Sequence, residues 1–213
     1  ADHAVTSESL TTDRIEVLRG PAVLLFGGQA VGGAVNAIDK RIPRKVPDGI
    51  VHVDGIAGYG SAADEWSAGS AADVRAADRF VLHLDGSYRK SDDLRIGGAL
   101  LAPALRADVL ALAAEEESEG HQDEAAELRE LAFARGKLPN SASESWTLGA
   151  GAAFIDDGGN LGVSFGVYDT SYGIPTAPGA GHAHEAGGAE EGPVTIGLRQ
   201  YRADLRGEVE LGS

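Results

Sequence analysis

The sequence predicts a mainly β protein: a partial transmembrane antiparallel β-barrel of about six strands, preceded by a shorter α+β segment and interrupted by a helical loop. Three observations support this prediction. Six windows alternate apolar and polar residues with a period of two. Each window is close to the roughly 9 to 11 residues that a tilted membrane strand needs. The connections between windows are tight turns or long loops.

The faces of the six windows differ in the same way each time, with one apolar face and one polar or charged face. In the third window, for example, Leu82 and Leu84 face away from His83 and Asp85. A soluble β-sandwich is the alternative architecture, but its strands are usually shorter, with a mode of about 5 to 6 residues. The pattern therefore favours strands that meet lipid on the apolar side. The windows are residues 51–59, 66–75, 79–89, 145–154, 160–170 and 201–211.

Aromatic residues and loop lengths predict how the strands are oriented. Aromatic side chains fall at the ends of windows, where a membrane barrel places its interfacial girdle. Short turns at 76–78 and 156–159 alternate with long loops at about 91–144 and 171–199, so the long loops share one end of the sheet. This asymmetry is typical of outer-membrane barrels. The aromatic residues are Tyr59, Trp66, Phe80, Tyr88, Trp146, Phe154 and Tyr201.

The loop at about 91–144 has helical composition in two stretches, residues 104–117 and 122–135. Pro103 suits a first helical turn, and Gly120 suits the break between the two helices. We expect a helical hairpin, whereas a solvated and partly disordered acidic loop is the alternative. The expected contact between the helices is formed by Leu105, Val109, Leu112, Ala125, Leu128, Leu131 and Ala132.

Several function classes are disfavoured by composition and motifs. The net charge of −15 argues against a nucleic-acid partner, and the absence of cysteine excludes disulfides, thiolate metal sites and a cysteine nucleophile. Gly162 to Gly166 matches the G-x-S-x-G pattern, but Ser164 lies within an alternating strand with no helix after it. We therefore expect no catalytic residues and no enzyme activity. No apolar run approaches the roughly 20 residues of a membrane helix, so a membrane protein of this sequence must span as a barrel.

Residues 14–40 have a different organisation, which predicts a strand, a turn, a short helix, a glycine turn and a second strand. Ile15 to Leu18 form the first expected strand, and Gly20-Pro21 opens the helical turn. Gly32-Gly33 allows close backbone packing before the second strand at Ala34 to Ile38. The stretch is RIEVLRGPAVLLFGGQAVGGAVNAIDK.

This stretch resembles the C-terminal half of the plug domain of TonB-dependent outer-membrane receptors, IEVLRGPxxxLYGxxAxGGxVNxIxK. Phe26 stands in place of the usual Tyr, and Asp39 stands where Thr is common. The resemblance implies that residues 1–46 are the C-terminal part of a plug and that residues 47–213 are the N-terminal strands of a barrel. It also implies a bacterial outer-membrane location, active transport, contact with outer-membrane lipid, and energy coupling through the periplasmic protein TonB.

A second resemblance is to the zinc-uptake branch of these receptors, in residues 89–97, 172–175 and 201–208. It implies zinc or another metal ion as the transported ligand, with no cofactor required. The branch tends to carry a longer loop rich in His and Asp, whereas the loop here holds two histidines. Imidazole nitrogen and carboxylate oxygen are ligands that zinc accepts. The candidate metal ligands in this loop are His182, His184, Glu185, Glu190 and Glu191.

Other interpretations remain open from the residues alone. The loop at 171–199 is alternatively a solvated acidic loop with two incidental histidines. Within the same family, a receptor for a siderophore, haem or cobalamin is the second candidate. From other classes, a passive porin or adhesin barrel is a candidate that does not explain residues 14–40, and a soluble β-sandwich binding module is the third. The chain begins at Ala1 without a signal peptide. We therefore expect it to be a fragment, with the rest of the plug, the energy-coupling box and further barrel strands outside these 213 residues.

Overall fold

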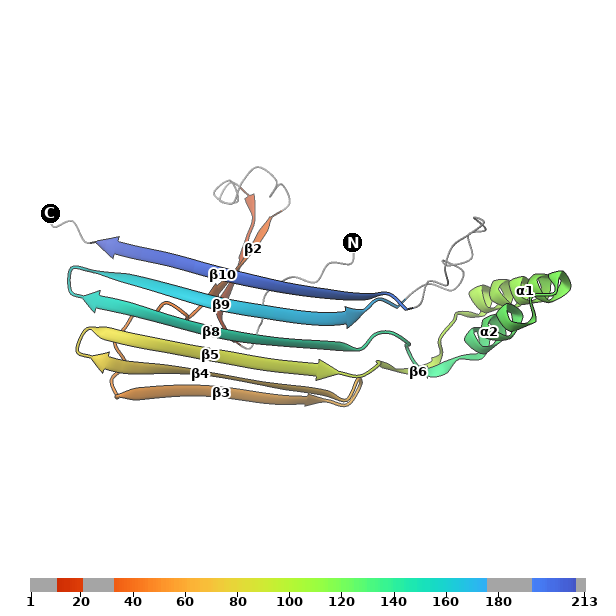
Figure 1. Cartoon of the computed structure of the whole chain (residues 1–213), viewed down its shortest axis with the longest axis horizontal. Coiled ribbons are helices and arrows are strands. Elements are labelled where there is room, and N and C mark those ends of the chain that lie inside the picture. Colours follow the sequence, from red (N-terminus) through yellow and green to blue (C-terminus); the bar gives the residue numbers. More distant parts are fainter. Residues whose placement is uncertain (1–10, 21–32, 176–192, 210–213) are drawn as a thin grey trace.

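The computed structural model describes residues 11–20, 33–175 and 193–209. Most of them belong to one antiparallel sheet of six strands (Figure 1). The sheet is open, because β3 and β10 have no strand on their outer sides among the described residues. The order across the sheet is β10 (Thr195–Val209), β9 (Gly159–Gly173), β8 (Ser143–Asp156), β5 (Phe80–Ser91), β4 (Glu65–Ala77) and β3 (Val51–Gly60).

The six predicted windows correspond to these six strands, which confirms the mainly β, antiparallel part of the prediction. Every strand is longer than its window because cross-strand pairing continues into residues that do not alternate. The largest difference is in β10, which begins at Thr195 and not at 201. Tyr201 therefore lies well inside this strand, and its expected position at a strand end was wrong.

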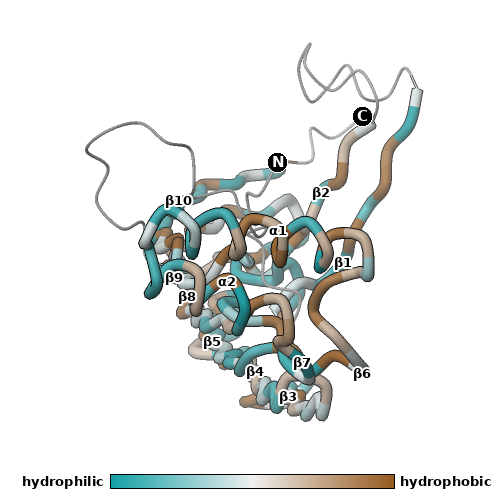
Figure 2. The backbone as a smooth tube through the Cα atoms, turned by 90° about the vertical axis from the view of Figure 1, so that its right-hand side faces the viewer, coloured by the Kyte–Doolittle hydropathy of each residue, from teal (hydrophilic) through white to brown (hydrophobic). Residues whose placement is uncertain are grey.

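Cross-strand register places whole rows of like residues on each face of the sheet. One apolar row crosses all six strands: Val53, Ala72, Leu84, Ala150, Phe165 and Ala203. The adjacent row on the opposite face is polar or glycine throughout: His52, Asp73, His83, Gly151, Ser164 and Asp204. Figure 2 shows the structure from the end that carries the helical hairpin, with each residue coloured by its hydropathy. Because side chains of a strand point alternately to the two faces, the period-two pattern produces this separation directly.

A helical hairpin extends beyond the end of the sheet that carries the long loops (Figure 1). It consists of α1 (Pro103–Glu119) and α2 (Gln122–Phe133), joined to the sheet by the short pair β6 (Arg95–Ala99) and β7 (Arg135–Lys137). Gly120 adopts the left-handed conformation, with φ 95°, that ends α1. Neither helix combines the length and the apolar composition needed to cross a membrane.

The contact between the two helices differs in part from the predicted one. Val109 is buried as expected, as are Ala125, Leu128 and Ala132 on α2, and Leu131 packs against them half-buried. Leu105 and Leu112 are 39% and 40% exposed, so their assignment to the contact was wrong. Ala113 on α1, which is fully buried, also belongs to this cluster.

The N-terminal described residues form a separate two-stranded hairpin of β1 (Thr12–Leu18) and β2 (Ala34–Asp39), paired antiparallel. Both predicted strands are therefore confirmed. Gly33 has φ 142°, and a Cβ there would lie 3.0 Å from the Leu18 carbonyl oxygen, so this position requires glycine. The helical turn expected after Gly20 lies outside the described residues. In Figure 1 the β1–β2 hairpin crosses the face of the six-stranded sheet at a steep angle.

Candidate functional site

The two faces of the sheet have the opposite burial from that of a water-soluble protein. On β5, His83 and Asp85 are only 2% and 7% exposed, whereas Leu84 between them is 58% exposed. The same inversion holds on β9, where Ser164 is buried and Phe165 is exposed. An apolar patch of this extent on a protein surface marks contact with another apolar phase or partner. The exposed apolar face comprises Val51, Val53, Leu82, Leu84, Leu148, Leu161, Val163, Phe165 and Leu205.

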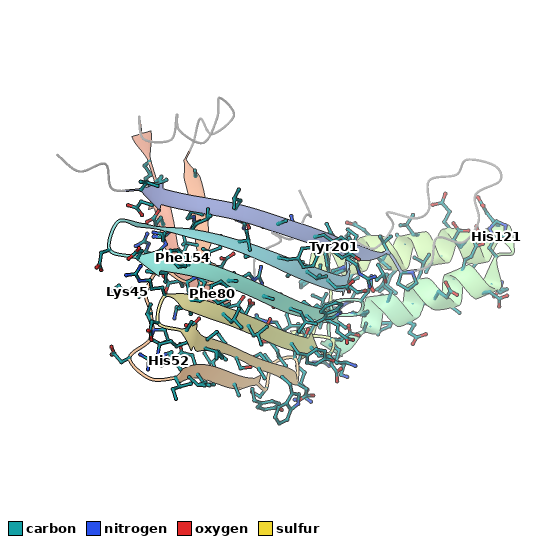
Figure 3. The ribbon with its side chains drawn as sticks, turned by 60° about the vertical axis from the view of Figure 1, so that its left-hand side comes forward. Lys45, His52, Phe80, His121, Phe154 and Tyr201 are labelled. Carbon is teal, nitrogen blue, oxygen red and sulfur yellow. The ribbon has the colours of Figure 1, made fainter. Side chains whose placement is uncertain are left out.

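Aromatic side chains frame this apolar face at both ends. Phe80 and Phe154 are cross-strand partners beside the short turns (Figure 3). Near the long loops, Tyr88 pairs with Trp146, and the rings of Tyr59 and Trp66 lie 4.8 Å apart. The strand-end position of these aromatic residues was predicted from the sequence.

The polar face is covered by the chain segment that follows β2. Ile42, at 5% exposure, and Pro43 are buried against this face, and Arg41 reaches along it. The Arg41 guanidinium donates two hydrogen bonds to the Asp85 carboxylate, from Nε to Oδ2 at 2.9 Å and from Nη2 to Oδ1 at 3.0 Å. The two side chains are 14% and 1% exposed. Burial opposes the charge of Arg41, but the hydrogen bond and the charge of Asp85 outweigh it and raise the pKa of Arg41.

His83 extends this pair into a network of four charged or titratable side chains. Its Nδ1 lies 2.7 Å from Asp73 Oδ1, and its Nε2 lies 3.6 Å from Asp85 Oδ2. A fully buried imidazole between two carboxylates, one of them held by Arg41, has no free ligand atom directed toward solvent. This arrangement is better suited to holding residues 41–43 against the sheet than to binding a solute.

Glycines on β8 and β9 make room for the covering segment. A Cβ at Gly149 would lie 2.2 Å from Arg41 Nε, and one at Gly151 would lie 1.7 Å from the Arg41 carbonyl oxygen. The sequence analysis did not identify Arg41 or this seat, which we define as Gly149 and Gly151 on β8 with Gly162 and Gly166 on β9. The recurrence of glycine on the polar face of these two strands could have indicated it, because strand glycines often mark close approach of another backbone.

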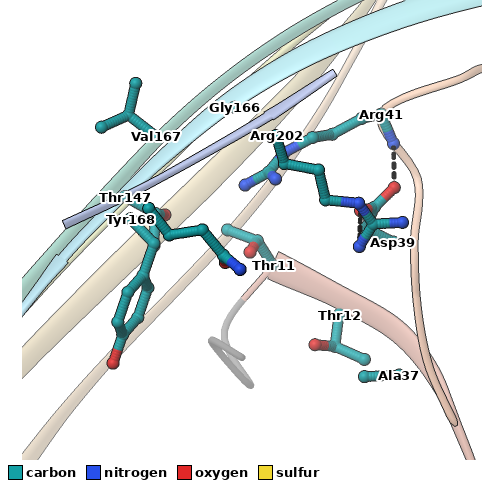
Figure 4. Close-up of a pocket in the computed structure, with 11 residues that line it drawn as sticks. Thr11, Thr12, Ala37, Asp39, Arg41, Thr147, Gly166, Val167, Tyr168 and Arg202 are labelled. Carbon is teal, nitrogen blue, oxygen red and sulfur yellow. Dashed lines mark hydrogen bonds and ion pairs between the residues drawn. The ribbon is translucent and has the colours of Figure 1, made fainter. Parts of the chain in front are cut away.

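Between the β1–β2 hairpin and the sheet is a polar cavity of about 70 Å³ (Figure 4). Asp39 lines this cavity; its carboxylate accepts a hydrogen bond of 3.2 Å from the Arg41 backbone N–H and lies 3.9 Å from the Arg202 guanidinium. Thr12 on β1 and Thr147 on β8 also line it. A cavity of this size accommodates only a few water molecules.

The metal ligands predicted from the sequence lie outside the described residues, which end at 175 and resume at 193. His182, His184, Glu185, Glu190 and Glu191 therefore stay a prediction. His52, on the polar face of β3, lies with its Nε2 3.3 Å from Asp54 Oδ2, and both side chains are more than half exposed.

A different set of His and Glu side chains does converge among the described residues, at the tip of the helical hairpin (Figure 3). Glu116, Glu119 and His121 place ligand atoms within 4.8 Å of one another. His121 Nδ1 lies 2.8 Å from Glu116 Oε2 and 3.6 Å from Glu124 Oε2. Sequence reasoning missed this cluster, although the spacing E-x-x-E-x-H across the Gly120 turn was its signal.

The charge of His121 is favoured by its acidic neighbours. The hydrogen bond to Glu116 is the main cause, and the charge of Glu124 adds to it, so the pKa of His121 is raised above 6.5. His121 is therefore protonated at mildly acidic pH, and a metal ion has to displace the imidazole proton in order to bind.

No family model matches the chain. The resemblance to TonB-dependent receptors therefore stays a prediction from the sequence.

Proposed function

We propose that the chain is part of an outer-membrane TonB-dependent transport receptor and that its cargo is zinc or another metal ion. The observation that carries the proposal is the inverted burial of the sheet, with Leu84 and Phe165 exposed and His83 and Asp85 buried. In a barrel wall, the apolar face contacts lipid and the polar face contacts the lumen. The β1–β2 hairpin and residues 41–43 lie on the polar face, where a plug belongs.

The distribution of loops supports the same proposal. The turns at Asp78-Arg79 and Asp157-Gly158 are tight, whereas the helical hairpin extends from the opposite end of the sheet. Short periplasmic turns and long extracellular loops are the usual asymmetry of bacterial outer-membrane barrels. Among the residues that the structure describes, β3 and β10 have unpaired outer sides, which fit a wall that continues into further strands because an open edge invites pairing.

A receptor for a siderophore, haem or cobalamin fits the same sheet and hairpin equally well. Metal-ion cargo is favoured by the candidate ligands at 182–191 and by the resemblance of residues 89–97, 172–175 and 201–208 to the zinc-uptake branch. A soluble β-sandwich would need a second layer over the apolar face, and the described residues supply none.

The membrane part of the proposal is tested with single spin labels, which the cysteine-free sequence allows without background. The labels replace Leu205 and Ala203 on the apolar face of β10 and Arg206 and Gln200 on its polar face. With the protein folded in lipid vesicles, we expect dissolved oxygen to relax the labels at 203 and 205 more strongly, and a water-soluble nickel chelate to relax those at 200 and 206. Equal access of the chelate to both sets would contradict a lipid-facing sheet.

The metal part is tested by titrating zinc into the intact chain, with the double variant His182→Ala/His184→Ala and the variant His121→Ala. We expect saturable binding tighter than about millimolar, lost in the double variant and retained in His121→Ala. Loss in His121→Ala alone would move the metal assignment to the helical hairpin. Absence of saturable zinc binding in the unmodified chain would remove the metal assignment and leave the other cargo classes.

A further inference from the structure

We propose that Arg41 and Ile42 anchor the β1–β2 hairpin to the sheet, and that the hairpin pivots at Lys40 while the chain from Arg41 onward stays seated on β8 and β9. The proposal goes beyond the proposed function, since it concerns where a movable segment is fastened and does not depend on the cargo. The boundary between the part that moves and the part that stays in place then lies at residue 40, whereas the domain boundary expected from the sequence lies at residue 46.

The seat for the anchor is formed by backbone, and no side chain has to move to create it. A Cβ at Gly166 would lie 2.4 Å from Arg41 Nη1, and a Cβ at Gly162 would lie 2.4 Å from Ile42 Cγ2. Together with Gly149 and Gly151, these glycines leave four positions on the polar face of two adjacent strands without a side chain, beside Arg41 and Ile42. A Cβ at Gly151 would overlap the Arg41 backbone, and a Cβ at Gly149, Gly162 or Gly166 would overlap the Arg41 or Ile42 side chain, so a larger residue at any of them requires part of the anchor to shift.

Inside this seat the contacts are buried and specific. Both guanidinium bonds from Arg41 end on the Asp85 carboxylate, whose side chain is 1% exposed. Such a bidentate pair is geometrically demanding, and separating it would leave a buried carboxylate without its cation. Ile42, at 5% exposure, adds an apolar contact beside Gly162, where the same face of the sheet carries the buried residues Val81 and Ala153.

On the other side of Lys40, the described ion pairs between the β1–β2 hairpin and the sheet are exposed or half-exposed. Lys40 Nζ lies 3.6 Å from Asp54 Oδ2, and the Arg202 guanidinium lies 3.9 Å from Asp39 Oδ2. Such solvent-exposed pairs contribute little to stability. The apolar side chains of the hairpin do not compensate, because Ile15 and Val17 on β1 are 57% and 63% exposed.

The contrast between the two sides locates the pivot. A two-stranded hairpin of this kind is only marginally stable by itself, so its position depends on where it is attached. Its attachment is strong immediately after Lys40 and weak before it. A force or a ligand that acts on the hairpin therefore breaks the exposed pairs first and leaves the Arg41–Asp85 pair intact.

The experiment measures distances between pairs of spin labels by pulsed electron paramagnetic resonance in the folded chain. The hairpin pair is Val17→Cys with Leu205→Cys, and the segment pair is Lys45→Cys with Leu205→Cys. A sheet pair, Val53→Cys with Leu205→Cys, reports whether the sheet itself is intact. We expect a single narrow distribution for all three pairs in the otherwise unmodified chain.

Three variants separate the anchor from the pivot. Lys40→Ser removes the Lys40–Asp54 pair, leaves the Arg202–Asp39 pair in place, and should broaden the hairpin distribution alone. Gly166→Ala and Asp85→Asn disturb the seat and the buried pair, and each should broaden both the hairpin and the segment distributions. Gly55→Ala is the matched control, because a Cβ there meets only the Gly69 carbonyl oxygen at 3.8 Å, and it should change none of the three.

Two results would overturn the proposal. One is a segment distribution that broadens together with the hairpin in Lys40→Ser, and the other is narrow hairpin and segment distributions in both Gly166→Ala and Asp85→Asn. If the sheet pair broadens in Gly166→Ala, the decision passes to Asp85→Asn, which adds no atom to the seat. These distances test the anchor independently of the transporter proposal. If the chain folded in plain buffer, the transporter proposal would fail, but the same distances could still be compared.

Discussion

The effect of Leu84→Arg on the free energy of unfolding tests whether Leu84 faces lipid. Leu84 is 58% exposed at the middle of β5, four residues from Phe80 and four from Tyr88, which mark the aromatic ends of the apolar face. At about 3.3 Å per residue, the eight-residue separation is roughly 26 Å along the strand. A strand tilt of about 40° reduces this to about 20 Å along the membrane normal, which places Leu84 near the midplane.

An arginine at the midplane of a barrel wall costs about 2–4 kcal/mol, whereas the same change on a water-exposed surface is usually within about 0.5 kcal/mol. We therefore expect Leu84→Arg to lower the free energy of unfolding in lipid vesicles by about 2–4 kcal/mol. Leu94→Arg is the control, because Leu94 is 39% exposed between β5 and β6, outside the sheet. It should change stability by about 0.5 kcal/mol or less.

The assay is reversible urea unfolding of the folded protein in vesicles, followed by the emission of Trp66 and Trp146. Both tryptophans lie in the sheet, so the signal reports loss of the wall itself. Equal, small effects of Leu84→Arg and Leu94→Arg would refute the argument, because they would show that position 84 meets water. A large effect of Leu84→Arg in plain buffer would also refute it, since the residue would then be buried against protein.

Three further predictions concern the helical hairpin and the covering segment. Leu128→Ala should destabilise the helical hairpin by about 2–5 kcal/mol, because Leu128 is 3% exposed between the helices. Hydrogen exchange of the α1 and α2 amides measures this effect, and an unchanged exchange rate would contradict the packing. Because the pKa of His121 is raised in the folded hairpin, its charge stabilises the hairpin fully below pH 6.5, and this contribution is lost as the pH rises through the folded pKa. An NMR titration of the His121 imidazole should give a pKa above 6.5, and His121→Gln should remove this part of the pH dependence; a pKa at or below 6.5 would contradict the Glu116 contact. Arg41→Lys should expose the segment after β2 to trypsin at Lys45 faster than in the unmodified chain, because a lysine cannot make both bonds to Asp85; an unchanged cleavage rate would show that the second bond contributes nothing.

The strands and their faces were predictable because they depend on a local rule. Side chains in a strand alternate between two faces, so the alternation of Leu82, His83, Leu84 and Asp85 is sufficient to separate apolar from polar positions. Helix signals around Pro103 and Gly120 are equally local, and α1 and α2 appear where these signals predict them. The β1 and β2 strands followed from the same kind of evidence.

Local sequence patterns were therefore sufficient to predict the elements and the character of each face. The folded arrangement was needed to show that Arg41 meets Asp85, that glycines on β8 and β9 make room for Arg41, and that Glu116 and His121 converge across a helix turn. The same holds for the position of Tyr201 inside β10 and for the exposure of Leu105 and Leu112. The physical reason is that these features depend on register and on contacts between residues far apart in the chain, such as the pairing of β5 with β8 across the helical loop, which no local periodicity specifies.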